Sequence, residues 1–263
     1  MCLIVFAWQQ HPTCSLVLAA NRDEFHRRPA DAADFWADHP GLLAGRDREA
    51  GGTWMGISET GRFAAITNVR DPEGGQGKAP RSRGELTTDF LSADTSPEVY
   101  LADVANRCDA YLGFNLLVGD GQSLWYLHGG GDAPTPHRLE PGLYGLSNAA
   151  LDVPWPKVSL ARKTLAQILS DVGDAAVDHA DLRRCVADRT LADTNALTPH
   201  GLEGTMARRL SAQFIVTPEY GTRCCTTLTQ GPEGWEFQEQ RFDTGGAIIG
   251  ESVFRSDAGL RQE

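Results

Sequence analysis

Apolar runs alternate with short polar turns through the first seventy residues, and this pattern predicts antiparallel strands. The run 2–8 is apolar at every position, which is typical of a strand covered on both faces. A turn separates it from a similar run at 15–20, so the two are predicted to form a hairpin. The segments 54–58 and 63–69 form a second predicted pair. The segment 27–52 between the pairs is rich in Pro, Asp and Gly, and we expect a long irregular excursion of the kind that often carries function.

Helical spacing begins near residue 84. Ser96-Pro97-Glu98 supplies an N-cap and a proline at the first helical position, so a helix is expected over 96–111. The clearest amphipathic helix is predicted over 157–170. Further expected elements are helices at 84–91 and 180–187 and strands at 114–118, 123–128, 142–147, 213–216, 224–229 and 235–242. This order of elements predicts an α+β or layered α/β/α protein with mostly antiparallel sheets.

Composition limits the size and the partners of the protein. The chain has 263 residues, of which 41% are hydrophobic, and we expect a single domain over 1–263. A net charge of −11 predicts repulsion from nucleic-acid phosphates and from anionic membranes. The opening apolar run is too short for a secretion signal, and no stretch reaches the ~20 apolar residues that span a bilayer. We therefore expect a soluble, cytoplasmic protein with no nucleic-acid partner and no stable membrane insertion.

Residues that commonly bind metals or nucleotides lack the spacing that such sites need. None of the six cysteines forms a C-x-x-C pair, and none has a histidine at zinc-finger spacing. The seven histidines include no i, i+4 pair on a predicted helix. The glycines at 129–131 lead into no helix with phosphate-binding spacing. We therefore expect no metal and no cofactor, and we expect the thiols to be reduced.

Cys2 follows the initiator methionine, which is normally removed when the next residue is small. Removal would leave a thiol and an α-amine on one residue. An α-amine has a pKa of about 7.7–8.0, so it can accept the thiol proton at neutral pH and activate a nucleophile. Taken by itself, a cysteine at this position is also consistent with a small buried hydrophobe.

A polar cluster, Asn21-Arg22-Asp23-Glu24, follows the second apolar run. In a hairpin, the end of the second strand returns beside the start of the first, so this cluster is expected next to Cys2. An arginine there would favour the thiolate, and an acidic side chain could bind and orient the α-amine. The alternative is a solvated loop with a surface ion pair.

Two asparagines stand where predicted strands give way to loops. Asn68 lies near the end of 63–69, and Asn148 ends the strand near 142–147. Asparagine amide groups can donate to the oxyanion that forms during acyl transfer. Asparagine at a strand end is also a common turn former, and this alternative stays open for both residues.

Several short strings together resemble one known family, the NRDE proteins, also called the transport and Golgi organisation 2 family. They occur in order along most of the chain: M-C at the start, N-R-D-E at 21–24, G-G-T-W-M-G-I-S at 51–58, A-A-I-T-N-V-R at 64–70, S-R-G-E-L at 82–86, G-F-N-L-L at 113–117, G-L-S-N-A at 145–149, P-W-P-K-V at 154–158 and Y-G-T-R-C-C-T at 220–226.

The resemblance implies a branch of the N-terminal nucleophile hydrolases with a four-layer α-β-β-α fold. Bile salt hydrolases and penicillin V acylases, which open with Met-Cys and cleave amide bonds, are similar to it. On this basis Cys2 corresponds to the nucleophile and Arg22 to the arginine after the second strand. Asn68 corresponds to the oxyanion asparagine, Asn148 to a second active-site asparagine, and Arg223 to a late arginine.

One position departs from the acylase pattern. The acylases place an aspartate three residues after that first arginine, where this chain has Phe25. Asp23 or Glu24 could take over its role of binding the α-amine, and we favour Asp23.

Two functions are therefore expected. The first is a cysteine N-terminal nucleophile amidohydrolase or acyl transferase acting on a small amide. The alternative, which the resemblance also implies, is a non-catalytic carrier or chaperone on the same fold, with a hydrophobic ligand such as haem or acyl-CoA. The sequence leaves open the oligomeric state and whether Met1 is removed.

Overall fold

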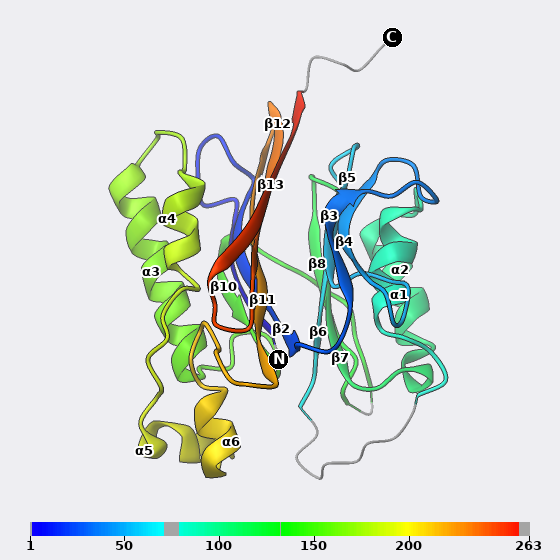
Figure 1. Ribbon diagram of the computed structural model, residues 1–263. Helices are drawn as coiled ribbons and strands as arrows, with labels where there is room; N and C mark the ends of the chain where they lie inside the picture. The colour runs from blue at the N-terminus through cyan, green and yellow to red at the C-terminus, as the bar shows by residue number, and fades with distance from the viewer. Residues whose placement is uncertain (1, 71–78, 132, 258–263) are drawn as a thin grey trace. The chain divides into compact units, whose positions relative to one another are not determined.

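The fold was obtained as a computed structural model, which describes residues 2–70, 79–131 and 133–257 (Figure 1). Tertiary contacts divide the chain into two compact units. The first unit comprises residues 1–27, 141–147 and 151–263, and the second comprises 28–140 and 148–150. The expectation of a single domain stays a prediction.

A six-stranded antiparallel sheet forms the centre of the first unit. Its strand order is β10 (Gly142–Leu146), β1 (Cys2–Trp8), β2 (Leu16–Phe25), β11 (Tyr220–Gly231), β12 (Gly234–Phe242) and β13 (Ile248–Asp257). β1 lies between β10 and β2, and all its residues after Cys2 are buried. Its apolar side chains on both faces explain this interior place, because a strand with no polar face can only be covered on both sides.

Helices of the first unit pack on this sheet. α3 (Pro156–Val172) contacts β1 and β10, and α4 (His179–Arg184) contacts β2 and β11 (Figure 1). The shorter helices are α5 (Thr194–Leu197), the 3₁₀ turn η2 (Thr198–His200) and α6 (Gly204–Arg209). α3 approaches β10 closely at Gly145, where an added Cβ would lie 2.6 Å from a methyl carbon of Val158.

The second unit is a seven-stranded antiparallel sheet with two helices. The strand order is β3 (Ala30–Phe35), β4 (Leu42–Asp47), β5 (Met55–Ser58), β6 (Phe63–Asn68), β7 (Phe114–Gly119), β8 (Leu124–His128) and β9 (His137–Arg138). α1 (Gly84–Leu91) and α2 (Pro97–Ala105) pack on it, and the 3₁₀ turn η1 (Cys108–Ala110) follows α2. Leu86, Phe90 and Leu101 of the helices form one buried cluster with Phe114 and Leu116 of the sheet.

The predicted hairpins and the α+β class with antiparallel sheets are confirmed. Ser96 caps α2 as expected, since its Oγ accepts a hydrogen bond from the Val99 backbone N–H at 3.4 Å. The helix expected over 96–111 is too long, because α2 ends at Ala105 and Asn106 caps it. Among the helices formed by the described residues, none is long and apolar enough to cross a bilayer.

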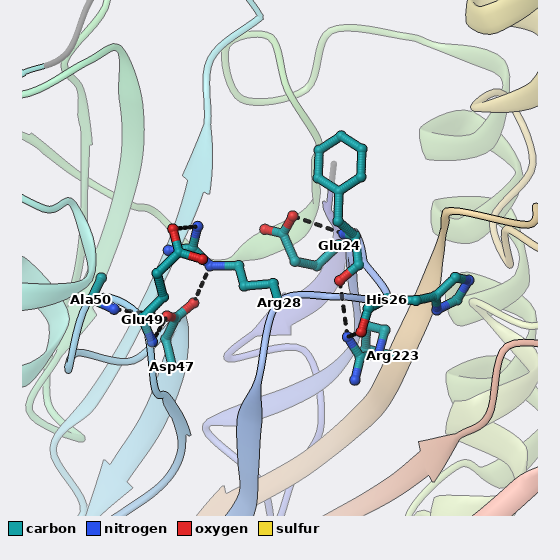
Figure 2. A network of polar contacts seen from close by, with 8 residues as sticks. Glu24, His26, Arg28, Asp47, Glu49, Ala50 and Arg223 are labelled. Atoms are coloured by element: carbon teal, nitrogen blue, oxygen red, sulfur yellow. Dashed lines mark hydrogen bonds and ion pairs between the residues drawn. The ribbon is translucent and has the colours of Figure 1, made fainter.

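The expectation of an irregular excursion over 27–52 is wrong, because two paired strands, β3 and β4, lie within it. Its polar residues form the turn after β4 instead. The Oδ1 atom of Asp47 accepts hydrogen bonds from the backbone N–H groups of Glu49 and Ala50, both at 3.0 Å. The Nε atom of Arg28 donates to Oδ2 of the same aspartate at 2.6 Å (Figure 2). The hydrophobic pattern did not predict β3, because it is an edge strand in which only Ala33 is fully buried.

The strand expected at 213–216 is also wrong. The segment makes only an isolated bridge, from Val216 to Gly221, and Gln213, Phe214 and Ile215 are buried without a strand. The pattern did not predict β9, β13, α5 or α6. None of the described side chains of β13 is buried, and its sequence has no apolar run longer than two residues, so it lacks the pattern of the buried strands.

The packing of α3 can be tested at one turn of the helix. Leu165 is fully buried, whereas Leu160 on the same helix is exposed. We expect Leu165→Ala to lower the free energy of unfolding by about 2–5 kcal/mol, because it leaves a cavity under the helix. Leu160→Ala should change it by less than about 0.5 kcal/mol. Urea denaturation of both variants measures the difference, and equal losses would contradict the packing described.

Candidate active site at Cys2

Cys2 is the first residue of β1 and is held in place by its backbone. It pairs with Arg22 across the β1–β2 ladder, as the hairpin predicted. Its carbonyl oxygen accepts a hydrogen bond from Oγ of Ser147 at 2.7 Å. The nucleophile candidate is therefore a paired, half-buried residue at the beginning of an interior strand.

The surroundings of the Cys2 thiol act on its pKa in both directions. Burial raises the pKa most, and the carboxylate of Asp23 raises it further. The positive charge of the amino terminus, a hydrogen bond to the Asp23 backbone and the charge of Arg22 lower it. The net direction is upward, so the thiol needs a base before it can attack a carbonyl carbon.

The polar cluster after the second apolar run belongs to β2 and is buried. This overturns the alternative of a solvated loop. Asn21 explains part of the burial, because its Nδ2 atom donates to the carbonyl oxygens of Val186 at 2.7 Å and of Gln213 at 2.9 Å. Arg22 and Asp23 follow it and are 5% and 2% exposed. The charged residues Arg22 and Asp23 of β2 are therefore buried in the first unit.

Asp23 is bound on both its side chain and its backbone. Its Oδ1 atom accepts a hydrogen bond from Oγ1 of Thr222 at 2.7 Å, and its carbonyl oxygen accepts one from the Tyr220 hydroxyl at 2.6 Å. Burial raises the pKa of this carboxyl, whereas the charge of Lys157, the amino terminus and the Thr222 hydrogen bond lower it. Glu24 is half-buried and its Oε1 atom accepts from the Phe25 backbone N–H at 2.8 Å. Of the two carboxylates, Asp23 is therefore the one coupled to the Cys2 thiol.

Arg223 lies at a β-bulge between β11 and β2. The ladder pairs Thr222 with Asp23 and Cys224 with Arg22, so Arg223 is the extra residue on β11. Its Nη1 atom donates to the carbonyl oxygens of Phe25 at 3.0 Å and of His26 at 3.2 Å (Figure 2). Burial lowers the pKa of Arg223, and the neighbouring charge of Arg22 lowers it further. The bulge thus places two arginines at one end of the β2–β11 pair.

Lys157 belongs to the same charged cluster and was not predicted. It is the second residue of α3 and is 3% exposed. Burial lowers its pKa, the charges of Asp23 and Cys2 raise it, and its own charge lowers the pKa of Asp23. The sequence does contain a pattern that indicates the burial of this lysine. Lys157 precedes Ala161 by four residues, so helical spacing puts it on the buried face of the helix.

Asn68 and Asn148 lie together in the second unit. Asn68 ends β6 with an exposed side chain, and its carbonyl oxygen accepts a hydrogen bond from Nδ2 of Asn148 at 2.8 Å. Asn148 is buried, and its own carbonyl oxygen accepts from the Arg70 backbone N–H at 2.8 Å. The Asn148 side chain therefore fixes the backbone of Asn68, and the role of both residues as oxyanion donors stays a prediction.

A third asparagine supports this pair and was also not predicted. Asn115 is fully buried in β7, where its Nδ2 atom donates to Oγ1 of Thr67 at 3.0 Å and to the carbonyl oxygen of Ala149 at 2.9 Å. Its Oδ1 atom accepts from the Tyr126 hydroxyl at 2.6 Å. A polar residue inside an otherwise apolar strand was the available signal. Among the described residues, no group of three or more His, Cys, Asp and Glu side chains is placed to hold a metal ion.

The model of the family described as Transport and Golgi organisation 2 matches residues 1–244. The chain belongs to this family. It is 42% identical over 253 residues to the human Transport and Golgi organization protein 2 homolog, covering 89% of this chain and 90% of that protein. It is 35% identical over 251 residues to the Bos taurus homolog, with the same coverage of 89% and 90%. The family resemblance read from the short motifs is therefore confirmed.

A solved structure outside this family shares the fold. The C2A mutant of the conjugated bile acid hydrolase from Clostridium perfringens superposes with a TM-score of 0.56, and the match covers 100% of this chain and 99% of that one. The identity is 9%, so the likeness concerns the fold alone. The family member described here thus shares the fold of that protein.

The structural role of Asn21 can be tested directly. We expect Asn21→Ala to lower the free energy of unfolding by roughly 2–4 kcal/mol, because it leaves two buried carbonyl groups without their donor. Asn195→Ala changes an exposed asparagine of the same unit and should be nearly neutral. Chemical denaturation gives both values. A loss below about 1 kcal/mol for Asn21→Ala would show that water replaces the two hydrogen bonds.

Proposed function

We propose that the protein is a cysteine N-terminal nucleophile enzyme, an amidohydrolase or acyl transferase acting on a small amide. The observation that carries the proposal is the environment of Cys2. A cysteine at the beginning of an interior strand pairs with a buried arginine and is coupled to a buried aspartate. Such an arrangement of charges around a thiol is typical of a reactive site, because a purely structural cysteine needs none of them.

The proposed reaction begins after removal of Met1. The α-amine of Cys2 accepts the thiol proton, and the sulfur attacks the amide carbonyl carbon, giving a tetrahedral oxyanion. The α-ammonium of Cys2 then gives the proton to the leaving nitrogen, and the C–N bond breaks. The amine departs, and the acyl group stays on the sulfur as a thioester. Water attacks this thioester while the α-amine accepts its proton, and the carboxylic acid is released as the thiol re-forms. If an amine replaces water, the same steps give acyl transfer.

The neighbouring residues have distinct proposed roles. Arg22 stabilises the thiolate by its positive charge, which lowers the pKa of the Cys2 thiol. Asp23 binds and orients the α-amine, and Arg223 fixes the end of β2 and is available to an anionic part of the substrate. A role of Asn68 and Asn148 as oxyanion donors stays an expectation from the family resemblance. The shared fold with a conjugated bile acid hydrolase supports amide chemistry but does not identify the substrate.

A second candidate function is favoured by a pocket in the first unit. The pocket has a volume of about 400 Å³, and its lining includes Arg189, Arg209, Leu191, Phe214 and Val216. This volume lies near the lower end of the range for small-molecule sites, and two arginines above apolar side chains suit an amphipathic anion. Carriage of an acyl-CoA or of haem, each held by its anionic end, is the corresponding function.

The enzymatic proposal is tested by removing the thiol. We expect Cys2→Ala to lower the turnover of a reactive amide substrate by roughly 10³-fold or more, because it removes the sulfur on which the proposed thioester forms. Cys14→Ala, which changes another half-buried cysteine, should retain activity. Intact mass of the same samples reports whether Met1 is removed. Undiminished turnover by Cys2→Ala would end the proposal.

The carrier function predicts a different result. Haem titration followed by absorbance, and acyl-CoA binding followed by calorimetry, should then saturate equally in the native protein and in Cys2→Ala, without amide turnover. Arg189→Glu with Arg209→Glu should weaken that binding at least ~10-fold, because each replaces an attractive charge by a repulsive one. Failure of both ligands to bind would exclude carriage of either.

A further inference from the structure

The last strand of the six-stranded sheet, β13, lies at the edge of that sheet (Figure 1). It has 10 residues, Ile248–Asp257, and β12 is its one partner among the strands of the described residues. An edge strand presents backbone N–H and C=O groups with which a further strand can pair. Many edge strands prevent such pairing by being very short. β13 is too long for this, so its side chains decide what the edge can bind.

The outer face of β13 joins an apolar centre to two opposite charges. Successive side chains of a strand point to opposite faces, so Glu251, Val253 and Arg255 share one face. All three are exposed, and Val253 is 52% exposed. Ile248 and Ile249 at the beginning of the strand are 56% and 60% exposed. Exposed β-branched residues on an edge strand favour the addition of another strand.

The two charged side chains are already oriented by β12. The Oε1 atom of Glu251 accepts a hydrogen bond from Nε2 of Gln240 at 2.5 Å. Arg255 donates to Glu236 from Nε at 2.8 Å and from Nη2 at 3.0 Å. Each of these contacts joins residues that lie directly opposite one another in the β12–β13 ladder. A further strand would therefore meet charges whose positions on the outer face are set in advance.

The order of these side chains is self-complementary. Val253 lies midway between Glu251 and Arg255, two residues from each. If two copies of β13 pair antiparallel about a two-fold axis at Val253, Glu251 of each copy lies opposite Arg255 of the other, and the two valines meet. Opposite residues of such a pair have Cβ atoms about 4.5–5.5 Å apart, which is close enough for an ion pair. A pairing centred on Glu251 or on Arg255 would oppose like charges, which is destabilising.

The edge strand β3 of the seven-stranded sheet differs in this respect. It carries Asp31 and Asp34 and no basic residue, so two copies of β3 would bring only negative charges together. The net charge of −11 also repels a second copy of the chain at long range. Self-association therefore needs a local attraction. Within the part of the chain that the structure describes, β13 is the edge strand that carries both acidic and basic side chains.

We propose that β13 is a self-association surface, on which a second copy of this chain pairs antiparallel about a two-fold axis at Val253. Residues 249–257 of the two copies overlap in this register, so the six-stranded sheet of one copy continues into that of the other. Backbone hydrogen bonds and the contact between the valines supply the affinity, whereas the exposed ion pairs select the register. Contact along one strand makes a small interface, so the dimer forms reversibly and depends on concentration.

Sedimentation velocity of the full chain, from about 1 to about 300 μM, tests for this dimer. Val253→Asp places two carboxylates opposite one another at the axis, and Glu251→Arg opposes arginines. Each should weaken dimerisation by at least ~10-fold. Glu203→Arg changes an exposed acidic residue outside β13 by the same charge and should leave the dimer unchanged. Circular dichroism shows which variants are folded.

A pair of charge-reversed variants tests the register. Glu251→Arg leaves only positive charges at the two positions, and Arg255→Glu leaves only negative ones. Each variant alone should stay monomeric, whereas an equimolar mixture should form a heterodimer, because every opposed pair then has opposite signs. If Arg255→Glu does not fold, mild oxidation of Val253→Cys decides, with the native chain oxidised in parallel. This variant should crosslink to itself, and Glu251→Cys should not, because that position lies about 13 Å from its copy along the strands.

A native chain that stays monomeric over the whole concentration range would overturn the proposal. A dimer that survives both Val253→Asp and Glu251→Arg would also overturn it, because the two copies would then meet elsewhere. A mixture of the charge-reversed variants that associates no more than its components would exclude the register at Val253, as would the same crosslinking by Val253→Cys and Glu251→Cys.

Discussion

The antiparallel pairing of β1 with β2 is the interaction on which the site depends. It sets Cys2 opposite Arg22, and a register one residue different would point every side chain of β1 to the other face. Both strands lie in the interior of a sheet, so the packing of their buried apolar residues maintains this register. The chemistry proposed for Cys2 thus depends on apolar contacts up to six residues away along the strand.

The charged end of this strand pair is stabilised by β11. Because Arg223 is an extra residue in β11, Thr222 pairs with Asp23 while Cys224 pairs with Arg22. The same bulge therefore allows the hydrogen bond from the Thr222 hydroxyl to the Asp23 carboxylate and adds a second arginine at this end of the strands. The carboxylate, two arginines and a lysine come from β2, β11 and α3. The charges near the thiol are therefore supplied by elements far apart in sequence, and each of them is too expensive to bury alone.

Much of this arrangement could be predicted from the sequence, because it follows from local patterns. The run 2–8 and the apolar residues after it specify a hairpin, and the hairpin alone brings Arg22 to Cys2. The edge strand β3 could not be predicted, since one buried residue in six leaves no periodicity to detect. Asn21 and Lys157 were missed for another reason. The burial of Asn21 depends on partners at 186 and 213, and no local pattern encodes contacts across such separations. The spacing of Lys157 from Ala161 does indicate a buried face, but it does not reveal which charges lie beside the lysine.

The hydrogen bond from Ser147 to the Cys2 carbonyl has a consequence for how the protein matures. It joins residues 145 positions apart, so at ribosomal rates Ser147 is synthesised roughly 7–30 s after Cys2. Until then, β2 is the only one of the two sheet neighbours of β1 that has been synthesised. When β10 follows, it pairs along the other side of β1, and Ser147 binds the Cys2 carbonyl. The first residue of this interior strand therefore gains this backbone partner only after more than half of the chain has been made.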